Sequence, residues 1–449
     1  MNALSEFRGL VFRRALLLCL AGLFVFGTER SPAETAPATP AEKKEGEKGA
    51  EPSGFVPPLP FIARLGEVPD WSALDDYQRT ITREEFTYLL HHCYARSPEE
   101  ASDHIQIRSD RVLILKQSNF PERGWYDLRF RTEDKLSTDG PRFWRKPVEM
   151  DDLPDNSTKP LQGLRIAIDP GHIGGEWVTW DDRHFLLGKD TIPVREGEMT
   201  LTVARVLERD LTLLGATVFL TRESHHPTTT ERVETLGEEA RAYLLQRGQI
   251  PSPRLIASTA KSMFAISSEI RARGELLNGS FQPDLALCLH FDASPWGSRP
   301  AFRSPNHLHL LINGCYSRGE IAEDDTRFEM VRRILQRIYY EELALADVVS
   351  RTMQRETRLP AFHYDGTRGM SVNDNDLVWA RNLLANRVFS CPVLFFEPFC
   401  MNHRETHLRV QEGPYEALRE INGIYRKNIY QEYADGITAG LVRYYRRQR

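Results

Sequence analysis

Leu164-Arg-Ile-Ala-Ile-Asp-Pro-Gly-His-Ile-Gly-Gly175 is the stretch around which the rest of this sequence is organised. Its leucine and two isoleucines alternate with smaller or polar residues until Asp-Pro-Gly ends the run, which predicts a short buried strand followed by a turn. His172 comes directly after this strand, and the two glycines that follow allow the backbone to turn tightly beside a ligand. Catalytic and metal-binding groups of α/β sheets collect at such strand ends. His172 is therefore a candidate functional residue.

Three more candidates stand at corresponding places further along the chain. His290 follows the apolar run 285–289, and Glu397 follows the apolar run 393–396. Glu196 opens the helix predicted over residues 195–214, where a carboxylate is favoured by the helix dipole. If the three strands are parallel, their carboxyl ends lie at one edge of the sheet. We therefore expect His172, His290 and Glu397 to lie close together.

Two histidines and a carboxylate, with water in the fourth position, form a catalytic zinc site. A second carboxylate is then needed to accept the proton of the water and pass it to the leaving group. Glu397 suits this role, because its apolar strand raises the pKa of the carboxyl group. Glu176, Asp181 and Asp182 could each replace Glu196 as the carboxylate ligand, although the position of Glu196 at a helix start favours it.

Strands and helices alternate from Leu164 onward, which is typical of an α/β fold. We expect a mainly parallel, twisted sheet flanked by helices, preceded by a small α+β N-terminal domain. Besides the strands above, the pattern predicts strands over 216–222 and 308–313. It predicts helices over 195–214, 265–277, 328–355, 374–386 and, for the most part, 412–446.

The N-terminal third divides into three segments. Residues 1–30 carry arginines before a 13-residue apolar run and are expected to be a signal peptide, although an uncleaved anchor is the alternative. Residues 31–62 are rich in Pro, Ala, Glu and Lys and are expected to be a disordered linker. Residues 63–150 form the predicted small α+β domain, of unknown role. Residues 163–449 form the domain that carries the chemistry.

Composition excludes several classes of protein. The formal net charge of −5 argues against a nucleic-acid partner. Removal of residues 1–30 would leave no segment long and apolar enough to span a membrane. The five cysteines that would remain have no CxxC spacing, so neither a disulfide scaffold nor a cysteine zinc site is expected.

The motifs around His172 (Asp-Pro-Gly-His-x-Gly-Gly), Glu196 and His290 (Leu-His-Phe-Asp-Ala) together resemble the zinc-dependent N-acetylmuramoyl-L-alanine amidases of the bacterial cell wall. The resemblance runs from about residue 164 to the C-terminus. It implies hydrolysis of the amide between N-acetylmuramic acid and the L-alanine of peptidoglycan. It also implies zinc held by His172, Glu196 and His290, with Glu397 as the catalytic glutamate. The expected signal peptide predicts that the protein is exported, to the periplasm or cell envelope.

Two departures from the family pattern concern the residues near the site. The family usually has Asn two residues after its last histidine ligand, where this chain has Asp292. After the catalytic glutamate, Pro398-Phe-Cys-Met-Asn402 is one residue shorter than usual and lacks a glycine. Asp292 and Asn402 are expected to bind substrate, and Trp177 is expected to line a sugar–peptide groove.

Other interpretations remain open. His307 and His309 alternate on one strand and could bind a metal, but histidines on an α/β sheet more often pack or form hydrogen bonds. A zinc peptidase acting on stem peptides would use the same four residues. A non-catalytic peptidoglycan-binding module derived from the amidase fold is a further alternative. An activating protein is a candidate partner besides peptidoglycan.

Overall fold

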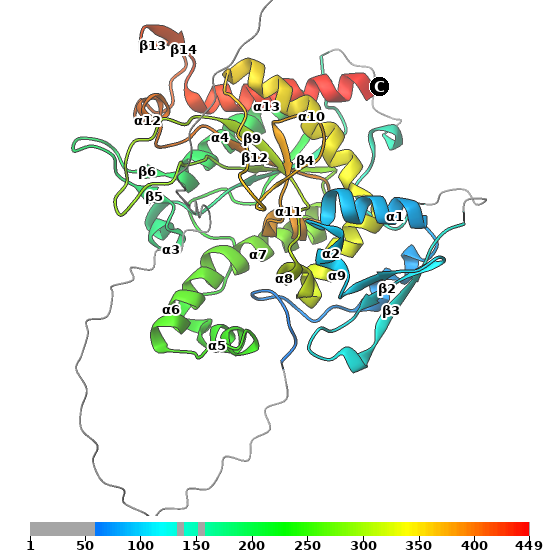
Figure 1. Ribbon diagram of the computed structural model, residues 1–449. Coiled ribbons are helices and arrows are strands. Elements are labelled where there is room, and N and C mark those ends of the chain that lie inside the picture. The colour runs from blue at the N-terminus through cyan, green and yellow to red at the C-terminus, as the bar shows by residue number, and fades with distance from the viewer. Residues whose placement is uncertain (1–58, 133–138, 151–157, 449) are drawn as a thin grey trace, which may run out of the picture. The chain divides into compact units, whose positions relative to one another are not determined.

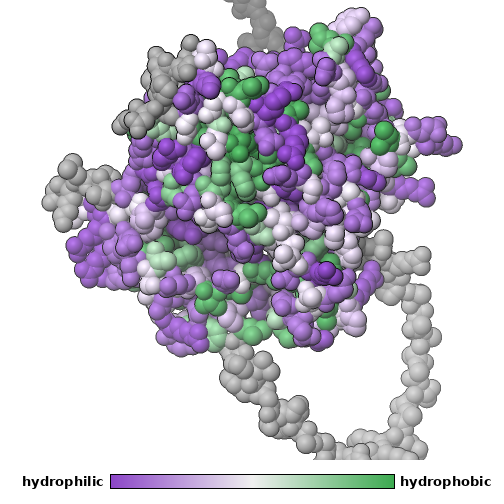
Figure 2. All heavy atoms as spheres, turned by 180° about the vertical axis from the view of Figure 1, so that it is seen from behind, coloured by the Kyte–Doolittle hydropathy of each residue, from purple (hydrophilic) through white to green (hydrophobic). Residues whose placement is uncertain are grey.

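The computed structural model describes residues 59–132, 139–150 and 158–448 (Figure 1). The expected signal peptide and residues 31–58 of the expected linker lie outside the described residues. None of the described helices combines the length and apolar character needed to cross a membrane. Seen from behind, hydrophobic residues gather in a band near the centre of an otherwise mainly hydrophilic surface (Figure 2).

A seven-stranded sheet forms the centre of the fold, in the order β10-β11-β9-β12-β8-β4-β7. Its strands β4, β8 and β12 are adjacent and parallel, as expected. The sheet is mixed, however, because β9 pairs antiparallel with β12, and β10 pairs antiparallel with β11. The strands are β4 Arg165–Pro170, β7 Thr217–Leu220, β8 Leu285–Leu289, β9 Leu308–Ile312, β10 Met370–Ser371, β11 Val378–Ala380 and β12 Val393–Pro398.

Alternation along the strands fills a hydrophobic core on each face of the sheet. One face of β4, with Ile166 and Ile168, packs against the long helices α4 Glu196–Leu213, α10 Ile338–Thr357 and α13 Ile429–Gln448. The other face packs beneath α11 Leu384–Val388 and α7 Glu269–Glu275. Because successive side chains of a strand point to opposite faces, Phe395 and Glu397 lie on the face of the second core.

Helices α10 and α13 lie side by side (Figure 1), and two glycines of α13 allow their close approach. A Cβ added at Gly440 would lie 2.8 Å from the Cα of Val349, and one at Gly436 would lie 3.0 Å from Cγ of Met353. The remaining α-helices of the C-terminal part are α3 Val178–Asp181, α5 Gly237–Gln246, α6 Pro253–Ser262, α8 Arg318–Ala322, α9 Asp324–Leu335 and α12 Arg404–Gln411.

Three predicted helices differ from the observed elements. The helix expected over 328–355 is two helices, α9 and α10, separated by Arg337 in a left-handed conformation (φ 55°). Residues 374–386 form β11 and the start of α11, because Val378–Ala380 pairs with β9. Residues 412–446 include a hairpin, β13 Arg419–Ile421 and β14 Ile424–Arg426, whose turn is Asn422-Gly423 with φ of 50° and 79°. Asn-Gly is the favoured pair for such a turn.

Residues 63–150 contain a three-stranded antiparallel sheet and share a hydrophobic core with the C-terminal part. The strands are β1 Ile105–Ile107, β2 Arg111–Leu115 and β3 Trp125–Arg129, and α1 Arg83–Leu89 and α2 Pro98–Ala101 are the α-helices of this segment. Arg327 of α9 donates to the Leu115 carbonyl at 2.9 Å, and Arg337 contacts Glu85 at 2.7 Å. The chain before and after residue 150 is therefore joined by buried polar contacts as well as apolar ones.

Candidate active site

The carboxyl ends of β4, β8 and β12 bring three of the predicted residues together. His172 follows β4, His290 follows β8, and Glu397 lies near the end of β12, with its neighbour Phe396 paired to Leu289. The imidazole of His290 stacks on Phe395, with ring centroids 4.3 Å apart, so it lies on the same face as Glu397. The expectation that these strand ends share one edge is confirmed.

His172, Glu196 and His290 form a group that fits a metal ion. Each offers one ligand atom, and these atoms lie within 4.8 Å of one another. Nε2 of His172 and Nδ1 of His290 lie 3.3 and 3.2 Å from the same Glu196 oxygen. The Glu196 side chain is 1% exposed, and its other oxygen has no hydrogen-bond partner among the described residues. A buried carboxylate oxygen without a partner is costly unless a cation binds it, so the donor set fits zinc.

Asp181 orients His172. The Nδ1–H of His172 donates to the Asp181 carboxylate at 2.9 Å, and the same oxygen accepts from the Ile173 amide at 3.0 Å. This bond keeps the proton on Nδ1, so Nε2 is the nitrogen that can bind an ion once its own proton is lost, as in carboxylate–histidine–zinc arrangements. Asp182 instead contacts Lys261 at 2.8 Å. Asp181, one of the carboxylates considered as an alternative to Glu196, therefore hydrogen-bonds to the ligand His172 through the nitrogen that does not face Glu196.

Charges within the group oppose one another. Burial would lower the pKa of His172, but Asp181 and Glu196 raise it to about 9. Burial would raise the pKa of Glu196, but His172, His290 and Arg183 hold it well below its usual range. Burial lowers the pKa of His290. An ion that binds here has to displace the proton from His172, so binding should weaken as the pH falls.

A buried arginine holds the loop that carries His172. Arg273 in α7 is 2% exposed and contacts Asp169 at 3.0 Å and Glu269 at 2.7 Å. It also donates to the carbonyl oxygens of Pro170 and His172, both at 3.0 Å. His172 itself has φ of 62°, a conformation that a side chain other than glycine adopts only when its surroundings fix it. The Arg273 contacts provide such surroundings.

Glu397 lies between several charged groups. Burial, together with the carboxylates of Asp292 and Glu196, raises the pKa of Glu397 well above its usual range, while Arg183 and Arg381 act in the opposite direction. A glutamate of raised pKa can both accept and donate a proton near neutral pH. The raised pKa is the property that a general base and acid needs at this position.

The three residues expected to bind substrate lie in different surroundings. Trp177 packs on Phe264 with ring centroids 5.9 Å apart, in a cluster beside the His172 loop. Asn402 is fully buried. Its side-chain amide accepts a hydrogen bond from the Ser294 amide and donates to the carbonyl oxygens of Ser294 and Ala301, so it ties two loops together. The Asp292 carboxylate accepts from Nε2 of His307 at 2.6 Å. Contact of these residues with substrate stays a prediction.

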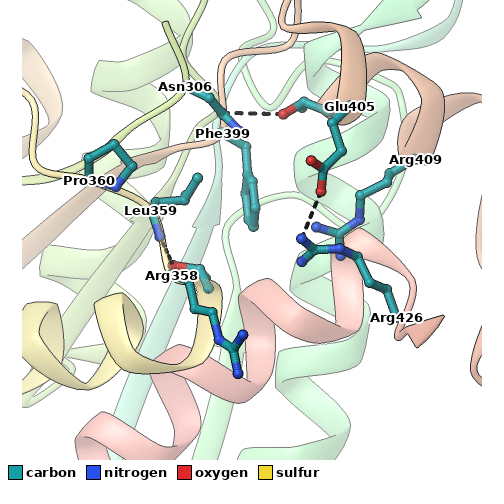
Figure 3. Close-up of a pocket in the computed structure, with 10 residues that line it drawn as sticks. Asn306, Arg358, Leu359, Pro360, Phe399, Glu405, Arg409 and Arg426 are labelled. Atoms are coloured by element: carbon teal, nitrogen blue, oxygen red, sulfur yellow. Dashed lines mark hydrogen bonds and ion pairs between the residues drawn. The ribbon is translucent and has the colours of Figure 1, made fainter. Parts of the chain in front are cut away.

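The turn after Glu397 lacks the glycine that is usual in the amidase family, and Phe399 takes the left-handed conformation instead. Phe399 has φ of 58°, a region that favours glycine, and its amide donates to the His307 carbonyl at 2.9 Å. Its ring lines a cavity of about 170 Å³, shown in Figure 3. There Glu405 points toward Arg426, which it contacts at 2.9 Å. Phe399 thus adopts the glycine-like turn at some cost in backbone strain.

No protein-family model matches the sequence, and no curated protein matches it. Solved structures to which the chain is similar include the CwlD amidase and N-acetylmuramoyl-L-alanine amidases. CwlD of Clostridioides difficile, solved with the GerS lipoprotein, is 13% identical, with 63% of this chain and 98% of that chain covered and a TM-score of 0.36. Ami1 of Mycobacterium abscessus is 15% identical, with 63% and 99% covered and a TM-score of 0.35. AmiC2 of Nostoc punctiforme is 15% identical, with 63% and 98% covered and a TM-score of 0.33.

The chemistry is therefore argued from the residues of the site. Sequence reasoning missed several residues of that site. The charge of Arg183 acts to lower the pKa of both Glu196 and Glu397. The Tyr433 hydroxyl donates to the His290 carbonyl at 3.1 Å. Neither residue lies at a strand end or in a motif, so no local signal marked them.

Proposed function

We propose that this chain is an exported zinc-dependent N-acetylmuramoyl-L-alanine amidase that hydrolyses peptidoglycan. The observation that carries the proposal is the group of His172, Glu196 and His290 on the sheet edge that also bears Glu397. The ligand set has the composition of a catalytic zinc site, and the nearby carboxylate supplies proton transfer. The choice of the amide bond as substrate rests on the sequence motifs.

In this mechanism, His172, Glu196 and His290 hold the ion, and Asp181 keeps His172 in the required tautomer. Zinc supplies acidification of water and polarisation of the scissile carbonyl. Glu397 accepts the proton of the attacking water and donates it to the nitrogen of the departing L-alanine. The raised pKa of Glu397 suits both steps, because the carboxylate must be protonated and deprotonated in one cycle.

The test uses purified sacculi, added zinc and mass spectrometry of the released products. We expect stem peptides with free L-alanine amino ends. Glu397→Gln should retain zinc and lower turnover by about 10²- to 10⁴-fold, whereas His290→Asn should lose both. Glu412→Gln, at an exposed surface glutamate, is the matched control. Near-normal turnover of Glu397→Gln would refute the assigned role.

The same products separate the other functions. Shortened peptides still attached to sugar would indicate a zinc peptidase. Zinc-loaded protein that pellets with sacculi and releases nothing would indicate a binding module, or an enzyme that needs an activating protein. Addition of envelope extract to that sample distinguishes the last two, because only an enzyme would then release peptides.

A further inference from the structure

A second group of metal-ligand side chains lies beside Glu397. Asp292, His307 and His309 each offer one ligand atom, and these atoms lie within 4.8 Å of one another. In the sheet, β12 lies between β8 and β9, and Glu397 pairs directly with His309. Residues directly opposite in adjacent strands point to the same face, so His309 and Glu397 share a face. Among the described residues, only these two groups bring three potential ligand atoms within 4.8 Å of one another.

His309 has a polar atom that the protein leaves unsatisfied. The residue is 3% exposed, and its Nδ1 has no hydrogen-bond partner among the described residues. Its Nε2 lies 3.1 Å from the Tyr364 hydroxyl, which also accepts from Arg381 at 3.4 Å. With Nε2–H donating to Tyr364, Nδ1 presents a lone pair. Metal-binding histidines usually have this arrangement, with the second nitrogen held by a neighbouring group.

The other two members are hydrogen-bonded to each other. Nε2 of His307 lies 2.6 Å from an Asp292 oxygen, and the His307 side chain is 9% exposed. An ion with bonds of about 2.0–2.1 Å in tetrahedral geometry holds its ligand atoms roughly 3.3 Å apart, so a small opening of this contact would admit one. The Cys400 thiol lies 3.4 Å from the same His307 nitrogen. Imidazole and carboxylate ligands in this combination suit zinc and related divalent transition metals.

We propose that Asp292, His307 and His309 form a second binding site for a divalent transition-metal ion, beside Glu397 and distinct from the first group. An ion here would give the orphaned His309 nitrogen a partner and offset the charge of Asp292. It would also place positive charge beside Glu397. The inference concerns metal occupancy and does not depend on which bond the protein cleaves.

The experiment measures metal stoichiometry of the full chain. The protein is stripped with a chelator, dialysed against zinc, freed of excess ion and analysed for zinc per chain. We expect roughly two ions for the unmodified chain, and the loss of one in His309→Asn and in His172→Asn. The two substitutions together should abolish binding. His363→Asn, at an exposed histidine beside Trp379 near the cluster, is the matched control and should keep both ions.

Asp292→Asn provides a second variant in case His309→Asn fails to fold, which circular dichroism would reveal. Its side chain is 24% exposed, and the amide can still hydrogen-bond to His307. Loss of one ion in folded Asp292→Asn supports the site. One ion in the unmodified chain, with the same value in Asp292→Asn and none in His172→Asn, would overturn it and leave the cluster as a hydrogen-bonded network. Loss of peptidoglycan hydrolysis with two ions still bound would count against the proposed function alone.

Discussion

Replacement of Arg273 by methionine tests the idea that a buried ion-pair network holds the His172 loop. The substitution keeps an apolar stem but leaves the carboxylates of Asp169 and Glu269, 2% and 1% exposed, without their cation. Loss of one partner of a buried pair destabilises a protein by about 3–5 kcal/mol. Asp169 still accepts from the Thr221 hydroxyl, and Glu269 still accepts from the Thr228 and Thr229 amides. We therefore expect the lower value, about 3 kcal/mol.

Urea unfolding followed by tryptophan fluorescence measures the change, because the midpoint shifts in proportion to the free energy of unfolding. The variant Asp169→Asn/Glu269→Gln/Arg273→Met removes all three charges and should recover much of the loss. Arg241→Met, at a guanidinium 49% exposed, is the control and should stay within about 0.5 kcal/mol. If Arg273→Met is as stable as this control, or the triple variant is no more stable than Arg273→Met, the reasoning is refuted.

Three further predictions concern the site and the acid stability of the fold. In Gly197→Ala the added Cβ would lie 2.2 Å from the Ile173 carbonyl oxygen. We therefore expect the free energy of unfolding to fall by about 1–3 kcal/mol and zinc binding to be lost. The control is Gly237→Ala, where the Cβ meets nothing within 4 Å, and equal zinc affinity in the two variants would contradict this. Asp181→Asn should weaken zinc binding about 10- to 100-fold in a chelator competition, because His172 loses its charged partner; an unchanged affinity would show that Asp181 does not tune the ligand. Burial and the charge of Arg327 lower the pKa of His104 to about 4, whereas its pKa in the unfolded chain is about 6.5. Between these two pH values the unfolded state binds more protons than the folded state. The free energy of unfolding should therefore fall as the pH drops from 6.5 toward 4. In His104→Gln the drop in the free energy of unfolding between pH 6.5 and pH 4 should be smaller by roughly 2 kcal/mol, allowing for partial exposure. An identical pH dependence in both proteins would rule His104 out as the cause.

The sequence by itself located the strands that build the site. Apolar runs that stop abruptly before His172, His290 and Glu397 predicted three strand ends, and all three lie on one edge of the sheet. Burial on both faces leaves unbroken apolar runs at 285–289 and 393–396, the strand before His172 alternates instead, and parallel strands align their ends. The position of Glu196 at a helix start was likewise readable. Asn422-Gly423 is an equally local signal for a hairpin turn, but it lies within the segment that the helical pattern assigned to a long helix.

Only the tertiary structure decided how these elements are aimed and what surrounds them. The reversal of β9 placed His309 opposite Glu397, and the pairing of Asp292 with His307 joins residues 15 positions apart. Arg273 reaches its Asp169 partner across 104 positions. Such contacts leave no periodic or compositional trace, because they depend on long-range packing rather than on local conformation. For the same reason Phe399 can adopt a left-handed turn that its sequence disfavours, since the surrounding contacts, and not its own propensity, set its backbone.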